Sequence, residues 1–121
     1  MKMNVNELTG SKLDWAVSKC DNTVWDDPEV ELYLFLKNHD NGFHYYSTNW
    51  AQGGPIIERE KINIHSNMTR MAKYPDYDWL ADCPEHRQCV SFTGQTPLIA
   101  AMRCYVASKL GDVIDIPEEL F

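Results

Sequence analysis

The sequence predicts an α+β fold in which an antiparallel sheet is packed with about three helices. Helix-capping residues and apolar residues at helical spacing lie near positions 9–20, 49–61 and 96–110. Short apolar and aromatic segments bounded by turn residues lie between them. The order helix, hairpin, helix, strands, helix is most simply satisfied by one sheet with the helices packed on it.

Length and charge limit the class of protein. The chain has 121 residues, which suits a single domain over 1–121, and 44% of them are hydrophobic, as in a globular domain. The formal net charge of -7 argues against nucleic acid or an anionic membrane as a partner, because both need clustered Lys and Arg. The longest apolar runs, 32–36 and 98–102, are too short to span a membrane, and the first residues are polar. We therefore expect a cytoplasmic protein.

The first third of the chain predicts a helix followed by a β-hairpin. Thr9 can cap a helix that ends near Cys20, because residues 13, 16, 17 and 20 are apolar at helical spacing. Residues 26–28 predict a turn. The aromatic and apolar segment 31–37 predicts a strand, buried on both faces or exposing two aromatic rings at a sheet edge. Asn41-Gly42 then predicts the hairpin turn, and residues 43–46 the returning strand.

Residues 47–61, STNWAQGGPIIEREK, combine helix-capping residues with two glycines and a proline, which helices avoid. Position 47 or 48 is the expected cap of a helix that ends near residue 61. Trp50 and Ile57 are seven apart and share a face with Gly53 and Gly54. We therefore expect Trp50 to anchor the helix start and the glycines to face a neighbouring element at close range. Pro55 lacks an N–H, so it should kink the helix or start a second segment.

The second half of the chain predicts strands and the clearest helix. Residues 62–65 alternate apolar and polar side chains, 77–81 and 88–92 are further strand candidates, and 66–75 predict a loop. Thr96 is the expected N-cap and Pro97 the first helical residue, where a missing N–H costs nothing. This helix spans 98–110 and stops at Gly111. Residues 112–121 are acidic and could form a C-terminal tail.

No motif in the chain predicts catalysis, so we expect no catalytic residues, no cofactor and no enzyme. Cys83, His86 and Cys89 are three potential metal ligands, but structural zinc needs four, so no metal site is expected. A cysteine nucleophile paired with His86 lacks any family signature around it. Gly53-Gly54 lacks the Lys-Ser/Thr that follows the glycines of a phosphate-binding loop.

An aromatic group in the middle of the chain provides the candidate binding residues. They are Tyr45, Tyr46, Asn49 and Trp50. Aromatic side chains usually fill cores, but Tyr and Trp are also enriched in protein interfaces. An exposed cluster here would be a docking site for a partner.

Three blocks of the sequence resemble a known family. They are ELTG and LDWAV within residues 7–17, YSTNWAQGGPIIERE at 46–60, and TPLIAAMR with VASKLGD within 96–112. These blocks are similar to the NinX family of lambdoid phages and, more weakly, to the phage α-β-α sandwich domain. The resemblance implies a phage or prophage origin, a two- or three-layer sandwich and an accessory role. It implies no reaction and no catalytic residues.

Two classes of function stay open. The first is a small accessory protein of the bacterial host's cytoplasm that binds an unknown phage or host protein or its own copies, so that a homo-oligomer is possible. The alternative is a small-ligand-binding protein or an enzyme with a pocket near Tyr46 and Trp50. The carboxylates are scattered and none is paired with a His at motif spacing, which favours the first class.

Overall fold

The computed structural model describes residues 1–21, 27–42, 44–66, 78–83 and 92–121. Within them the strands are β1 (Lys2–Asn4), β2 (Asn63–Ser66), β3 (Trp79–Asp82), β4 (Phe92–Gly94) and β5 (Val113–Asp115). The helices are α1 (Gly10–Asp21), α2 (Pro28–Asp40), α3 (Trp50–Glu60) and α4 (Pro97–Leu110), with 3-10 helices at Val5–Glu7 and Glu118–Leu120. The α+β prediction is confirmed.

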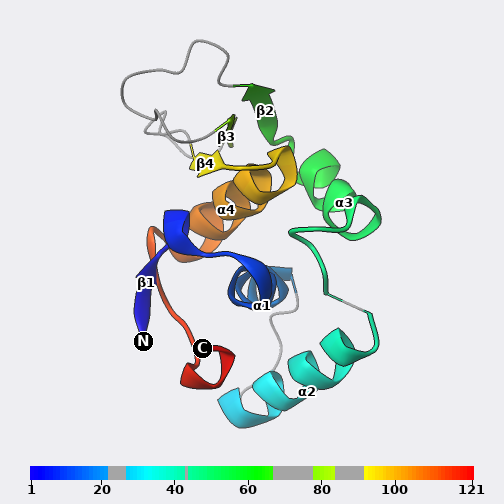
Figure 1. The fold of residues 1–121 in the computed structure, drawn as a ribbon, viewed down its shortest axis with the longest axis vertical. Helices are drawn as coiled ribbons and strands as arrows, with labels where there is room; N and C mark the ends of the chain where they lie inside the picture. The colour runs from blue at the N-terminus through cyan, green and yellow to red at the C-terminus, as the bar shows by residue number, and fades with distance from the viewer. Residues whose placement is uncertain (22–26, 43, 67–77, 84–91) are drawn as a thin grey trace.

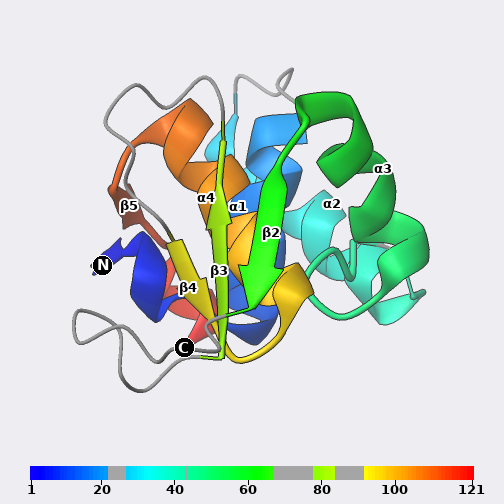
Figure 2. The same cartoon turned by 90° about the horizontal axis from the view of Figure 1, so that it is seen from above.

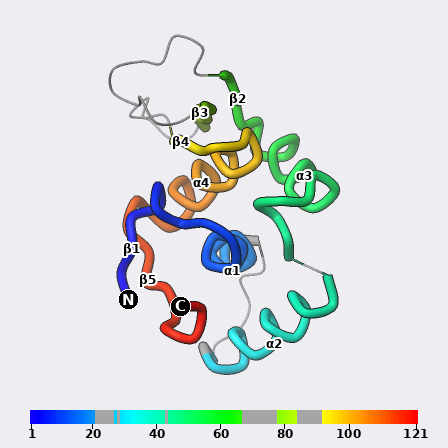
Figure 3. The backbone as a smooth tube through the Cα atoms, viewed as in Figure 1, coloured from blue at the N-terminus to red at the C-terminus, as the bar shows by residue number. Residues whose placement is uncertain are grey.

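The elements are stacked in layers (Figures 1 and 2). In Figure 1 the sheet of β2, β3 and β4 lies at the top, α4 lies beneath it, α1 lies next, and α2 is outermost at the bottom. Helix α3 lies beside α4, and Figure 3 shows β1 and β5 side by side in a separate two-stranded sheet. Helix α2 is thus farthest from the sheet, and α4 and α1 occupy the middle of the molecule.

The three-stranded sheet is antiparallel throughout. Ile64 of β2 pairs with Ala81 of β3, and Leu80 of β3 pairs with Thr93 of β4. Strands β2 and β3 confirm the strands predicted at 62–65 and 77–81, with shifts of one or two residues. The strand predicted at 88–92 and the loop predicted at 66–75 lie mostly outside the described residues.

Helix α4 forms the centre of the core, as its capping residues and apolar composition predict. The Thr96 hydroxyl accepts a hydrogen bond from the Ile99 amide at 3.1 Å, Pro97 lies in the first turn, and the helix ends at Gly111. Leu98 and all residues from 100 to 107 are buried. The helix packs against the sheet, α1 and α3.

A buried cation on α4 joins three parts of the chain. Arg103 donates from Nε to the Leu8 carbonyl at 3.0 Å and from Nη1 to the Thr93 carbonyl at 2.7 Å. A charge removed from water must be compensated by such bonds. Arg103 therefore fixes the segment before α1 and strand β4 to the same helix.

Residues 28–40 form a helix, so the predicted hairpin is wrong. The Asp27 carboxylate caps α2 by accepting from the Glu29 amide at 3.0 Å, and Pro28 lies in the first turn. Acidic residues begin the helix and Lys37 lies in its last turn, which suits the helix dipole. This is the same cap-and-proline signal that starts α4. It outweighs the β preference of the aromatic run, because a short apolar run is ambiguous by itself.

The residues expected to make the hairpin turn instead end α2. The Asn41 amide donates to the Asn38 carbonyl and the Gly42 amide to the His39 carbonyl, both at 3.1 Å. Gly42 has a φ of 88°, the left-handed geometry that commonly stops helices. Residue 43 lies outside the described residues, and residues 44–46 are not a strand but lead into a turn at 46–48.

Helix α3 differs from the prediction in its cap and its buried face. Asn49, and not residue 47 or 48, is the cap, and it accepts from the Ala51 amide at 2.9 Å. The helix continues through Pro55 to Glu60 as one element. Gly53 and Ile56 are buried, whereas the Trp50 side chain is 54% exposed. The Tyr46 carbonyl and Leu98 lie next to Gly53, so this is the side of α3 that is buried.

Residues 112–121, for which the sequence allowed a free acidic tail, lie in part against the start of the chain. Strand β5 pairs with β1 in an antiparallel ribbon, with Met3 opposite Ile114. Ile114 and Ile116 are both buried. These two side chains lie on either side of the exposed Asp115 and bury one side of the segment, which explains why it does not project into solvent.

Candidate functional site

A buried carboxylate connects α1, α2 and the segment before α3. Asp14 of α1 accepts from the Ser47 amide at 2.9 Å and from the Ser47 hydroxyl at 2.7 Å. Nε2 of His39, on α2, lies 3.4 Å from the other carboxylate oxygen. Burial raises the pKa of Asp14 above its ordinary value of 3.8, although the bonds from Ser47 and His39 oppose that rise.

Aromatic and imidazole rings stack beside this carboxylate. His39 stacks on Tyr45 with ring centroids 4.0 Å apart and on Phe35 at 5.2 Å. His44 stacks on Phe35 at 5.9 Å, and its Nδ1 lies 2.9 Å from the Tyr46 hydroxyl. His44 has a φ of 64°, an uncommon geometry for a residue with a side chain. The stack holds the inner side of α2 against the turn before α3.

The candidate binding residues fall into two groups in the structure. Tyr45 and Tyr46 lie together in the ring stack, and Tyr46 is buried. Asn49 is occupied in capping α3. Trp50 is exposed and does not belong to this ring stack. The four residues therefore do not line one common surface, and Asn49 and Trp50 are the two that are exposed.

The side chains of Ser47, His39 and Asp14 lie close together here, but the hydrogen bonds do not connect them in the order that acyl transfer requires. In such a site the histidine lies between the serine and the carboxylate, so that it can take the hydroxyl proton. Here the Ser47 hydroxyl donates directly to Asp14, and Ser47 is only 2% exposed. The arrangement fixes α2 and the turn to α1 and offers a substrate no access.

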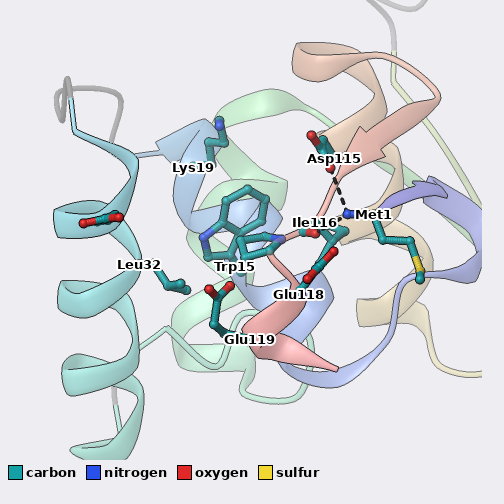
Figure 4. A pocket seen from close by; sticks show the side chains of 10 residues that line it. Met1, Trp15, Lys19, Leu32, Asp115, Ile116, Glu118 and Glu119 are labelled. Atoms are coloured by element: carbon teal, nitrogen blue, oxygen red, sulfur yellow. Dashed lines mark hydrogen bonds and ion pairs between the residues drawn. The ribbon is translucent and has the colours of Figure 1, made fainter.

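The larger of two described pockets lies where both ends of the chain meet α1 and α2 (Figure 4). Its volume is about 470 Å³. Trp15, of which only 5% is exposed, lies among the lining side chains with Lys19 beside it, the Lys19 Nζ being 5.1 Å from the ring centroid. The lining comprises Met1, Trp15, Lys19, Glu29, Leu32, Asp115, Ile116, Pro117, Glu118 and Glu119.

Acidic side chains line this pocket around an apolar interior. The Met1 ammonium donates to the Asp115 carboxylate at 3.0 Å and to the Ile116 carbonyl at 2.8 Å, as the dashed lines in Figure 4 mark. Nε1 of Trp15 is buried without a hydrogen-bond partner in the described part of the chain. Sequence reasoning missed this pocket because only folding brings residues near 1, 15, 30 and 116 together.

A smaller pocket of about 250 Å³ lies between the first 3-10 helix and α4. Its lining comprises Asn6, Glu7, Thr9, Gln95, Ile99 and Arg103. Neither of these two pockets includes Tyr46 or Trp50, the residues around which a ligand pocket was predicted.

The outer side of α2 carries apolar side chains in solvent. Val30, Tyr33 and Leu36 lie three residues apart and are all exposed, Tyr33 by 62%. Exposed charges, Glu29 and Lys37, flank them on the same side of the helix. We call these five residues the Tyr33 face. Sequence reasoning missed it because a strand would place Tyr33 and Phe35 on one side, whereas the helix buries Phe35 and exposes Tyr33.

Comparison with known protein families bears on the resemblance seen in the sequence. The profile described as bacteriophage P22, NinX matches residues 4–109. The chain belongs to the NinX family. No curated protein matches it. The profile match confirms the resemblance to the NinX phage family.

The cysteines of this NinX-family chain bear on the question of a metal site. Cys83 is buried with its Sγ 4.0 Å from the Glu60 carbonyl, and residues 84–91, with His86 and Cys89, lie outside the described residues. Burial raises the pKa of the Cys104 thiol, which disfavours the thiolate that a metal would need. In the described residues, no cluster of three potential metal ligands is found, and no helix has the length and apolar content to cross a membrane.

Proposed function

We propose that this NinX-family chain is a non-enzymatic phage accessory protein that works by binding another protein, and that the Tyr33 face is its docking surface. The observation that carries the proposal is the exposure of Val30, Tyr33 and Leu36 in one stripe on α2. Single exposed apolar residues are ordinary, but a contiguous apolar stripe usually marks an interaction site.

The composition of α2 supports this assignment. Apolar side chains occupy positions 30 and 32–36, which leaves no fully polar side on the helix. Apolar side chains on any side of a helix are more stable when a neighbouring element covers them. In this chain Phe35 is buried against the ring stack and Leu32 and Leu34 are half-buried, so the Tyr33 face is the side that a partner would cover.

The charges at either end of the face specify the chemistry of the partner. Glu29 lies at the start of α2 and Lys37 in its last turn, about 12 Å apart along the axis at 1.5 Å per residue. A complementary partner is a helix with an apolar stripe that has a basic residue opposite Glu29 and an acidic residue opposite Lys37. Such complementarity fixes the register and direction of docking more than it adds affinity.

In the described residues, the polar groups around Asp14 that could carry chemistry are engaged with one another inside the fold. The Ser47 hydroxyl and the His39 ring are both engaged with Asp14, and the Tyr46 hydroxyl is engaged with His44. These interactions support a binding protein more than a catalyst, because a catalytic group must reach its substrate.

Photo-crosslinking in phage-infected cells tests the proposal. A photoreactive amino acid at position 33 should yield a covalent adduct with a protein, whereas the same residue at the exposed position 48, in the turn before α3, should not. Circular dichroism and thermal melts should first show that both variants fold like the parent. Equal labelling at the two positions, or no protein adduct at position 33, would refute the assignment of the Tyr33 face.

A further inference from the structure

We infer that the partner of the Tyr33 face is a second copy of this chain, bound through antiparallel packing of two α2 helices. The inference rests on the proposed function, since it names the occupant of the same surface. It follows from the order of residues along the face, which is nearly palindromic.

The palindrome is centred on Tyr33. Val30 and Leu36 lie three residues before and after it, and Glu29 and Lys37 lie four before and after it. At 3.6 residues per turn, all four positions lie within about 60° of Tyr33 around the helix axis. All five side chains are exposed, and Glu29 lies at the edge of this surface, where it also lines the larger pocket.

A two-fold axis through Tyr33 matches every member of this face. In an antiparallel pair, the two Tyr33 rings meet on the axis, each Val30 lies at the same level along the helix as the partner's Leu36, and each Glu29 lies at the level of the partner's Lys37. The apolar side chains therefore gather around the two Tyr33 rings, and each end of the interface brings together one Glu29 and one Lys37 of opposite charge. A symmetric dimer requires this kind of self-complementary surface, and the opposed helix dipoles favour the antiparallel direction.

The charges of the Tyr33 face also disfavour a parallel arrangement of the two helices. Two parallel α2 helices would place Glu29 beside the partner's Glu29 and Lys37 beside the partner's Lys37, and like charges in contact are unfavourable. The matched register ends at Lys37.

The size of the surface sets the expected strength. One pair of short helices buries less area than the roughly 1,200–2,000 Å² of a standard stable interface. We therefore expect a weak dimer, with a dissociation constant on the order of 10 μM, that forms and separates readily. Inner contacts of α2 are unaffected, because Phe35 and His39 lie on the opposite side of the helix.

Analytical ultracentrifugation of the full chain over a range of concentrations tests this inference by charge exchange. Glu29→Lys and Lys37→Glu should each weaken association at least tenfold, because each replaces two attractive pairs with two repulsive ones. The double variant Glu29→Lys/Lys37→Glu restores opposite charges at both ends and should recover the dimer. Glu58→Lys, at an exposed carboxylate of α3, is the matched control and should associate like the parent.

A cysteine substitution tests the position of the axis. Tyr33→Cys should form a disulfide-linked dimer under mild oxidation, beyond the level of the parent chain, because the two copies of this position meet. Thr48→Cys, at an exposed position away from α2, should stay at the level of the parent.

Several results would overturn the inference. A parent chain that stays monomeric at concentrations well above 100 μM would do so, as would single charge variants that associate normally. A double variant that fails to recover would also do so. If the parent is monomeric while photo-crosslinking at position 33 captures a different protein, self-association fails and the proposed function stands. If neither is seen, both fail.

Discussion

The paired glycines of α3 allow one prediction to be worked out quantitatively. Gly53→Ala should destabilise the protein, and Gly54→Ala, one residue along the same helix, should stabilise it. A Cβ added at Gly53 would collide with the Tyr46 carbonyl oxygen and would lie 2.6 Å from Cδ1 of Leu98. A Cβ added at Gly54 would meet nothing within 4 Å.

The magnitudes follow from two opposing terms. Glycine inside a helix costs about 0.5–1 kcal/mol relative to alanine, so Gly54→Ala should raise the free energy of unfolding by about that amount. At Gly53 the same gain is opposed by overpacking, which costs about 1–3 kcal/mol. Leu98 can rotate away, but the carbonyl is backbone in a turn that Asp14 fixes through Ser47. We expect Gly53→Ala to lose about 1–2 kcal/mol net.

Urea denaturation and thermal melts followed by circular dichroism measure the difference. A change of 1 kcal/mol moves the melting temperature of a domain of this size by about 3–5 °C, so the two variants should melt clearly apart. Gly53→Leu and Gly54→Leu should widen the gap, because leucine enlarges the clash at Gly53 only. If Gly53→Ala is at least as stable as Gly54→Ala, Gly53 does not serve close packing.

Three further predictions concern the core, a buried acid and metal. Met102→Asp should abolish the cooperative melt, because Met102 is fully buried. Leu110→Gln, in the exposed last turn of α4, should melt like the parent. A folded Met102→Asp protein would contradict the central place of α4 in the core. Asp14→Asn should flatten the dependence of stability on pH. The raised pKa means that folded Asp14 binds its proton more tightly than the unfolded chain does, so its stabilising effect is complete below pH 3.8 and is lost as pH rises through the raised pKa. Urea titrations between about pH 4 and 7 should therefore show the parent losing stability relative to Asp14→Asn, and parallel profiles would refute this. Elemental analysis should find no stoichiometric zinc, and about one zinc per chain that is lost in Cys89→Ser would be the contrary result.

Local signals in the sequence were sufficient for three helices and part of the sheet. The Thr96 cap with Pro97 and Gly111 bounds α4, and the apolar spacing from Leu13 bounds α1. Alternation of apolar and polar side chains predicted β2, and β3 falls on the further strand candidate at 77–81. These signals work because caps, proline geometry and side-chain periodicity act within a few residues of one another.

The same kind of signal was present for α2 but was given too little weight. Asp27, Pro28 and Glu29 begin that helix as Thr96 and its proline begin α4, yet the aromatic run that follows predicted a strand. Asn41-Gly42 serves a hairpin or a helix end equally well, because both need left-handed geometry. The error hid the Tyr33 face, since only a helix separates Tyr33 from Phe35.

By itself the sequence determined the fold class, the family and the positions of the strongest caps, because each depends on neighbours in the chain. The tertiary structure decided which sides those elements bury. Gly53 and not Gly54 is the close contact, because the Tyr46 carbonyl and Leu98 lie on that side of α3. Asp14 received its partners from α2 and from the turn before α3, more than twenty residues away. Such pairings depend on surfaces that exist only after distant segments have packed together, so periodicity and capping cannot specify them.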